Sequence, residues 1–215
     1  LDITNIQKQT IAATKNLDGV SQSELEEDAH HKFIDGMSSA DIQDALIKTA
    51  VEKIDIDVPN WTFVAARLFI FFFFHRVGKA THGIKGEPYC HLREYLKYGK
   101  DAGRLIPNLG EGYDLDDLNT YIKPERDFLF NYLGIKTLYD RYLIKNNQAQ
   151  PIELPQHMFM AIAMFLAQDE TNKQQCAKEF YDVISKFEVM LATPTLSNAR
   201  TNRHQLSSCY IGSSP

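Results

Sequence analysis

The stretch "WTFVAARLFIFFFFHRV", residues 61–77, decides between a membrane protein and a helical protein with a buried core. Its apolar window runs from Trp61 to Phe74, covers 14 residues and contains Arg67. A membrane-spanning helix needs about 20 predominantly apolar residues. We therefore expect a helix buried in the protein, capped by Asn60, and no membrane segment.

The sequence before this stretch predicts three further helical features. A short helix is expected over "NIQKQTIAATKNL". A second helix is expected to begin at Ser21, with Glu24 three residues later as a capping box, and to end at Gly36. A third is expected to start at Ser38 or Ser39. The first 78 residues therefore read as a helical unit.

The sequence after it shifts in composition and then becomes helical again. Residues 79–119 are rich in Gly, Pro and Asp and hold one short helical pattern, "CHLREYLKYGK". Beyond Thr193 the text is polar and typical of a loop, and "QLSSCYIG" alternates enough to predict a short strand. The helices expected between these parts cover Pro124–Tyr142, Gln156–Ala167 and Asn172–Met190.

Composition bounds the class of partner. The 215 residues suffice for one large domain or two smaller ones, with 44% hydrophobic and 24% charged residues. The net charge of −5 and the scattered Lys and Arg argue against nucleic-acid and membrane-surface partners, because phosphate binding needs clustered cations. Three widely spaced cysteines suit a reducing cytoplasm better than a disulfide framework.

Phosphate-loop and metal motifs are not predicted. "GEGY" at residues 110–113 lacks the third glycine and the preceding strand of a nucleotide loop. The acidic run that begins at Asp114 lacks the glycine and glutamate of a calcium loop and is interpreted as a helix start. His82, Cys90 and His91 lack the fourth ligand and spacing of a structural zinc site.

The three cysteines have different surroundings. Cys176 falls on an apolar helical stripe with Phe180, and Cys90 opens a short helix without a partner thiol, so both are interpreted as structural. Cys209 follows serines, with Arg200 and then Arg203 and His204 upstream, as in a site for polar or anionic ligands. These residues alone leave an exposed loop cysteine equally open.

Four stretches then resemble one family. "LATPTLSNARTNRHQLSSCYIGSSP" resembles the segment that leads into the catalytic barrel of the class I ribonucleotide reductase large subunit. "GVSQSELEEDAHHKFIDGMSSADIQDALIKTA" and "VPNWTFVAARLFIF" resemble that family's ATP-cone, and "KPERDFLFNYLGIKTLYDRYLI" resembles its helical domain. The resemblance covers nearly the whole chain in the family's order.

The resemblance implies a mainly α fold that ends in the first strand of a ten-stranded α/β barrel. Residues 1–78 would form a truncated ATP-cone, residues 79–190 the helical amino-terminal domain, and residues 191–215 the start of the barrel.

The resemblance also implies an activity and a site. The family reduces ribonucleoside diphosphates to deoxyribonucleotides for DNA synthesis by a radical mechanism, in which two cysteines supply the electrons and end as a disulfide. Cys209 matches the first cysteine of that pair, and Thr193 and Ser208 match positions that contact the nucleotide. Hydroxyl groups are suited to bonding phosphate or ribose oxygens.

For the allosteric effectors ATP and dATP, the resemblance points to Asp2, Asn5, Ser39 and His75. Asn5 stands where the family usually carries lysine, Ser39 keeps the hydroxyl of a usual threonine, and His75 or the adjacent Arg76 replaces another lysine. Because charge-assisted hydrogen bonds are about twice as strong as neutral ones, these changes predict weaker attraction for a triphosphate.

The partners implied are the remainder of the large subunit, a radical-generating small subunit that contains metal, thioredoxin or glutaredoxin as reductant, and a second copy of the complete large subunit. No cofactor or metal is expected on this chain, which is expected to be cytoplasmic and inactive alone, as an incomplete subunit or half of a split one. Two alternatives belong to other classes: a non-catalytic ATP/dATP-sensing module acting through a partner protein, and a helical interaction protein with an incidental cysteine.

Overall fold

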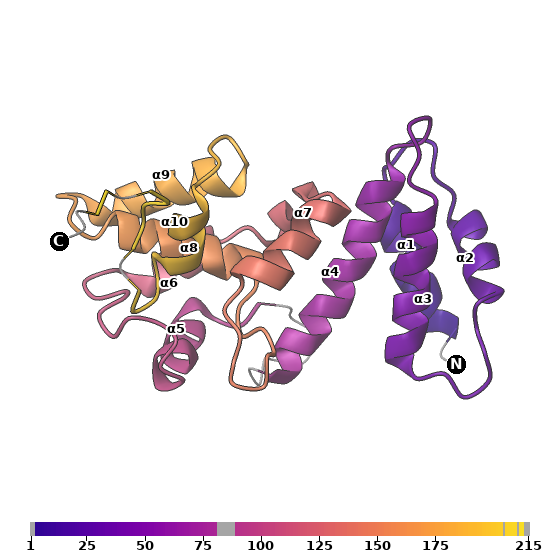
Figure 1. Cartoon of the computed structure of the whole chain (residues 1–215), viewed down its shortest axis with the longest axis horizontal. Helices are drawn as coiled ribbons and strands as arrows, with labels where there is room; N and C mark the ends of the chain where they lie inside the picture. Colours follow the sequence, from indigo (N-terminus) through magenta and orange to yellow (C-terminus); the bar gives the residue numbers. More distant parts are fainter. Residues whose placement is uncertain (1–2, 81–88, 204, 210, 213–215) are drawn as a thin grey trace. The chain divides into compact units, whose positions relative to one another are not determined.

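The computed structural model describes residues 3–80, 89–203, 205–209 and 211–212, and these residues are mainly helical (Figure 1). The α-helices are α1 (Ile3–Thr14), α2 (Gln22–His30), α3 (Ser39–Glu52), α4 (Trp61–Ala80), α5 (Leu92–Asp101), α6 (Leu115–Tyr121), α7 (Tyr132–Thr137), α8 (Pro155–Leu166), α9 (Lys173–Ser185) and α10 (Thr193–Asn198). A 3-10 helix, η1 (Pro124–Leu129), precedes α7, and a π-helix, η2 (Leu138–Tyr142), follows it. The helical character expected from the sequence is confirmed.

The strand expected over residues 205–212 is not seen. The residues described there are irregular, and the extended pairing recorded in the described part of the chain is an isolated bridge between Lys145 and Pro151. Ladder hydrogen bonds come from a neighbouring strand, so an alternating sequence without such a neighbour has nothing to hold it as a strand.

The chain divides into two compact units. The first comprises Leu1–His75 and Asp127–Leu138, and the second comprises Arg76–Arg126 and Tyr139–Pro215. The division into a truncated cone, a helical domain and a barrel start stays a prediction.

Local sequence signals explain how the helices of the first unit begin. The Ser38 hydroxyl accepts from the Asp41 N–H at 3.2 Å while the Asp41 carboxylate accepts from the Ser38 N–H, so α3 starts with the capping box of its sequence. Ser21 caps α2 by accepting from the Glu24 N–H at 3.3 Å, which is one half of the capping box expected there. The expected end of α2 was wrong: it ends at His30, and Gly36, with φ of +87°, serves the turn before α3.

Helix α4 forms the core of the first unit, as expected for a buried apolar helix. Its fully buried side chains are Val64, Ala65, Ala66, Leu68, Ile70 and Phe73. Helix α3 contacts it through Gln43, whose side-chain amide donates to the Leu68 carbonyl at 3.1 Å. Arg67 reaches the end of α1 by donating to the Ala13 and Lys15 carbonyls at 3.1 and 2.7 Å. The side-chain amide of Asn60, directly before α4, donates to the Asp18 carbonyl at 2.9 Å, and its role as a cap stays a prediction.

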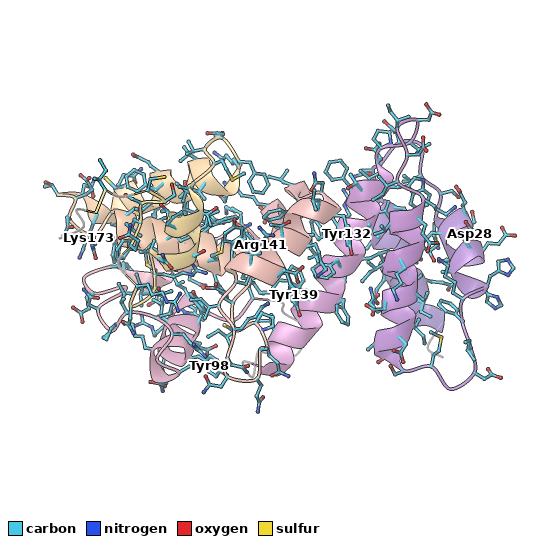
Figure 2. The ribbon with its side chains drawn as sticks, viewed as in Figure 1. Asp28, Tyr98, Tyr132, Tyr139, Arg141 and Lys173 are labelled. Carbon is cyan, nitrogen blue, oxygen red and sulfur yellow. The ribbon has the colours of Figure 1, made fainter. Side chains whose placement is uncertain are left out.

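The segment expected as one helix over Pro124–Tyr142 is instead divided into η1, α7 and η2. The break lies at Asn131, whose side chain accepts from the Gly134 N–H at 2.7 Å and so starts α7 anew. In the first unit, Tyr132 lies beside α4: its N–H donates to the Thr62 hydroxyl at 3.2 Å, and its ring packs edge-on against Phe69 (Figure 2).

The second unit is built around α8. Every residue of α8 from Pro155 to Met164 is buried, and α9 packs against it. The buried face of α9 differs from the apolar stripe expected from the sequence. Cys176 and Phe180, which were expected in that stripe, are half-buried. The buried residues of α9 are Ala177, Tyr181, Ile184 and Ser185. Tyr181 explains the difference, because its phenol donates to the buried Gln156 side chain at 2.7 Å. No helix in the described residues is both long and apolar enough to cross a membrane.

Candidate functional site

Thr193 begins a helix, which corrects the expectation of a loop after this residue. Ala192 precedes α10 in an extended conformation, and Pro194 occupies its first turn. Proline is tolerated there because the first N–H groups of a helix have no intrahelical partner. Leu196 is buried, whereas Thr193 stays exposed. Helix α10 therefore presents the predicted substrate-binding hydroxyl at its exposed start.

The hydroxyl of Thr193 lies 3.2 Å from the phenol oxygen of Tyr142. Tyr142 is the last residue of η2, and π-turns often occur at functional sites. This phenol was missed by sequence reasoning, because nothing in the sequence indicates that residues 142 and 193 meet.

Arg200 and Glu153 form a buried ion pair behind α10. Both side chains are 0% exposed. The Arg200 Nε donates to Glu153 Oε2 at 3.0 Å, and one Arg200 Nη2 hydrogen bond goes to Glu153 Oε1. The same guanidinium donates to the Leu196 carbonyl at 2.5 Å and to the Tyr142 carbonyl at 2.8 Å. The sequence suggested Arg200 as part of an anion-binding environment. Its guanidinium instead makes its hydrogen bonds to groups inside the protein.

The remaining acceptor positions of Glu153 are also filled. Its Oε2 accepts from the Tyr95 phenol at 2.6 Å, and its Oε1 accepts from the Ile144 N–H at 2.6 Å. Burial, and then the Glu153 charge, raise the pKa of Tyr95 well above its ordinary value, so this phenol stays protonated and donates. Buried charges are tolerated when they are paired and hydrogen-bonded in this way.

His157 on α8 completes the buried polar group. Its ring stacks on Tyr95 with centroids 4.7 Å apart, and its Nε2 lies 3.0 Å from the Cys90 carbonyl oxygen. Burial lowers the pKa of His157 to about 4, so the imidazole is neutral at physiological pH. A neutral ring fits this site, where the Nε2–H can donate to the carbonyl.

The segment that carries Cys209 is held more loosely. The Asn198 side-chain amide donates to the Gln205 carbonyl at 2.7 Å, and the Thr195 hydroxyl lies 3.4 Å from the Leu206 carbonyl oxygen. Ser208 and Cys209 are both exposed, and the Ser208 hydroxyl lies 3.9 Å from the Cys209 sulfur. The structure thus brings Ser208 to Cys209, and ties the chain before them to α10.

The other two cysteines fit their structural interpretation. Burial, and then the nearby Glu94, raise the pKa of Cys90 to about 11, so its thiol stays protonated at neutral pH. Cys176 is half-buried on α9. None of the described residues forms a cluster of three or more His, Cys, Asp or Glu that could hold a metal ion.

The predicted effector residues are only partly described. Asp2 lies outside the described residues, and the side chains of Asn5 on α1 and His75 on α4 do too. Ser39 is the exposed first residue of α3. Arg203 is exposed, and His204 lies outside the described residues.

Comparison with known proteins shows which protein family the sequence around this site matches. Residues 128–204 match the family model described as "Ribonucleotide reductase, all-alpha domain". The matched range includes Thr193, Tyr142 and both members of the Arg200–Glu153 pair. It ends before Cys209.

Relatives extend the match over the whole chain. The chain is 61% identical over all of its 215 residues to the ribonucleoside-diphosphate reductase subunit alpha of Helicobacter pylori (strain ATCC 700392 / 26695), and covers 26% of that protein. The chain belongs to the ribonucleoside-diphosphate reductase alpha-subunit family. The Treponema pallidum subunit alpha is 37% identical over 79% of the chain and 20% of its own length. The ribonucleoside-diphosphate reductase 1 subunit alpha of Escherichia coli (strain K12) is 32% identical over 93% of the chain and 26% of its own length.

The chain thus spans about a quarter of the length of the relatives just named and corresponds to the amino-terminal part of the alpha subunit. The resemblance inferred from four sequence stretches is confirmed.

Proposed function

We propose that this chain is part of a large subunit that reduces ribonucleoside diphosphates to deoxyribonucleoside diphosphates by a radical mechanism. The observation that carries the proposal is the exposed Cys209 beside Ser208, on a segment tied to α10, in a chain 61% identical throughout to a named reductase subunit. An exposed thiol is accessible both to a bound substrate and to an external reductant.

Cys209 would act as one of two reducing thiols. In that reaction the C2′–OH bond of the ribose breaks, the oxygen leaves as water, and a C2′–H bond forms. Two thiols lose two electrons and two protons and become a disulfide, which balances the two electrons gained by the sugar. The second cysteine would come from the remainder of the large subunit, and Thr193 and Ser208 would bond nucleotide oxygens through their hydroxyl groups.

We also propose that residues 205–212 become the first strand of a ten-stranded α/β barrel when the remainder of the large subunit is present. The alternating pattern of "QLSSCYIG" supports this, since every second side chain would then point to the same face. A neighbouring strand would supply the backbone hydrogen bonds that residues 205–209 need to become a strand.

Regulation by ATP and dATP is proposed for the first unit, at Asp2, Asn5, Ser39 and His75. The exposed hydroxyl of Ser39 at the start of α3 supports a role in bonding a phosphate, because helix N-termini favour anions. Asn5 and His75 stand where the family carries lysines, so the affinity would be lower than in a cone with both charges.

The proposed partners follow from the chemistry. A metal-containing small subunit would supply the radical, thioredoxin or glutaredoxin would reduce the disulfide, and two large subunits would pair, all in the cytoplasm. No metal or cofactor is assigned to this chain.

The test uses Cys209→Ser in an alpha subunit that contains this chain, assayed with the small subunit and a dithiol. We expect dithiol-dependent reduction of a ribonucleoside diphosphate to be lost. The matched control is Cys176→Ser, because this half-buried cysteine lies on a different helix, α9, and the activity of this variant should be retained. Unchanged activity in Cys209→Ser would overturn the proposal.

A further inference from the structure

Among the described residues, the Thr193 hydroxyl has a side-chain hydrogen-bond partner in the phenol of Tyr142, with 3.2 Å between the two oxygens. A freely rotating threonine hydroxyl can donate or accept in several directions, whereas one fixed by a neighbouring phenol has a defined direction. Tyr142 is half-buried and stands at the end of η2, so its position depends on how that turn is held.

The buried Arg200 holds both sides of this contact. Its Nη2 donates to the Tyr142 carbonyl at 2.8 Å, and its Nη1 donates to the Leu196 carbonyl within α10 at 2.5 Å. Because a guanidinium is planar, these two carbonyls are fixed relative to each other by one rigid group. Glu153 in turn fixes the guanidinium through its two oxygens.

The cost of burying this pair supports a purpose beyond stability. A buried ion pair is weak evidence for stability, because the loss of hydration offsets much of the attraction between the charges. Here one pair connects α5, η2, the segment before α8, and α10, which are four separate parts of the second unit. A pair with this many partners specifies a single arrangement of those parts.

We infer that Tyr142 is a positioning residue for the substrate-facing Thr193, and that the Arg200–Glu153 pair holds Tyr142 in place. The inference rests on the proposed role of Thr193 in binding the nucleotide. Tyr142 touches no reacting atom; it orients the Thr193 hydroxyl, and so acts on the binding of the ribonucleotide rather than on electron transfer.

Tyr142→Phe tests this in an alpha subunit that contains the chain. The change removes the phenol oxygen and keeps the ring and the main-chain carbonyl that binds Arg200. We expect the KM for the ribonucleoside diphosphate to rise about three- to tenfold, the range of one net hydrogen bond, with kcat and the thermal midpoint nearly unchanged. The matched control is Tyr139→Phe, which makes the same change in the same turn (Figure 2). The centroid of the Tyr139 ring lies 5.3 Å from Lys145 Nζ.

Two further variants separate positioning from folding. In a Thr193→Val background, Tyr142→Phe should raise KM no further, because the partner of the phenol is already absent. Arg200→Lys removes the planar fork, and should raise KM at least as much as Tyr142→Phe in the folded fraction. Leu118→Ala on α6 lowers stability through another buried side chain, and should leave KM unchanged.

The outcomes distinguish this inference from the proposed function. If Cys209→Ser abolishes activity while Tyr142→Phe leaves KM unchanged, the positioning role is wrong and the reductase assignment stands. Equal KM increases for Tyr142→Phe in the presence and absence of the Thr193 hydroxyl would also overturn it. Retained activity in Cys209→Ser would instead overturn the proposed function.

Discussion

The segments Thr193–Arg200 and 205–212 are separated by four residues in the sequence and are held in opposite ways. The first contains a helix and ends at a fully buried arginine with hydrogen bonds to Glu153, Leu196 and Tyr142. The second is mainly exposed in its described residues and is tied to α10 through the side chains of Thr195 and Asn198. The hydroxyl proposed to bind substrate therefore lies on a helix followed by a buried, multiply hydrogen-bonded arginine, whereas the thiol proposed to react lies on an exposed segment held through the side chains of Thr195 and Asn198.

This difference matches the two proposed roles, substrate binding by Thr193 and redox chemistry by Cys209. Binding groups need a fixed geometry, which the buried pair supplies. A redox thiol must also meet a second thiol and an external reductant, so exposure suits it. Among the described residues, Thr193 lies on the fixed segment and Cys209 on the exposed one.

The largest expected effect comes from breaking the buried pair. Glu153→Ala leaves Arg200 charged and without its partner in a fully buried site, and should lower the free energy of unfolding by about 3–5 kcal/mol. Urea denaturation of the alpha subunit, followed by a probe in the second unit, measures it. A loss below about 1 kcal/mol, typical of a surface pair, would show that α10 is held by other contacts.

Acid should destabilise the buried polar group that contains Arg200, Glu153 and His157, because His157 becomes protonated. Its pKa is lowered to about 4 in the folded protein, against about 6.5 in the unfolded chain, so below pH 6.5 the unfolded state binds more protons. The stability contributed by the neutral ring is present above pH 6.5 and is lost progressively as the pH falls toward 4. The loss should reach about 3 kcal/mol.

Denaturation curves at pH 7 and pH 4.5 would measure this loss. His157→Gln, which cannot be protonated in this range, serves as the control and should lose less stability between the two values. Equal losses in both proteins would assign the pH dependence to other groups.

Thiol labelling sharpens the contrast between exposed and buried cysteines. Cys90 is half-buried and has a pKa raised to about 11, so it carries little thiolate at pH 8. We expect Cys209, which is exposed, to react with a thiol reagent at least about 100-fold faster than Cys90. The Cys90 rate should rise about tenfold per pH unit between 8 and 10, because each unit raises its thiolate fraction tenfold. Similar rates for the two cysteines at pH 8 would contradict the described burial.

The smallest effect is expected at the exposed tie between the two segments. Asn198→Ala removes the hydrogen bond to the Gln205 carbonyl and should change the free energy of unfolding by less than about 1 kcal/mol. Amide hydrogen exchange should nevertheless become faster over residues 205–209, with residues 193–200 unchanged. Faster exchange in both ranges would show that the segments are held as one.

Much of the fold was predictable because its signals are local. The capping box of Ser38 and Asp41, the cap at Ser21 and the apolar run of α4 each depend on residues close in sequence. The division of Pro124–Tyr142 into three short helices was missed, because it depends on one asparagine side chain competing with helix continuation.

The candidate site residues could be named from the sequence, but the contacts that hold them in place could not. Thr193, Ser208 and Cys209 were named from a resemblance, and their roles stay predictions. The buried Arg200–Glu153 pair was not predicted, because the two residues lie 47 positions apart in the sequence and no periodic pattern marks such a contact. An arginine among polar residues indicates an anion site or an internal ion pair equally well, and only the fold decides between them.

The most direct test of the account follows the oxidation state of Cys209 across one turnover. A pre-reduced alpha subunit that contains this chain is mixed with small subunit and a ribonucleoside diphosphate without external dithiol, then alkylated under denaturing conditions and mapped by peptide mass. We predict that Cys209 becomes protected from alkylation in proportion to deoxyribonucleotide formed, while Cys90 and Cys176 stay fully alkylated. Product formation with Cys209 still fully alkylated would contradict the account.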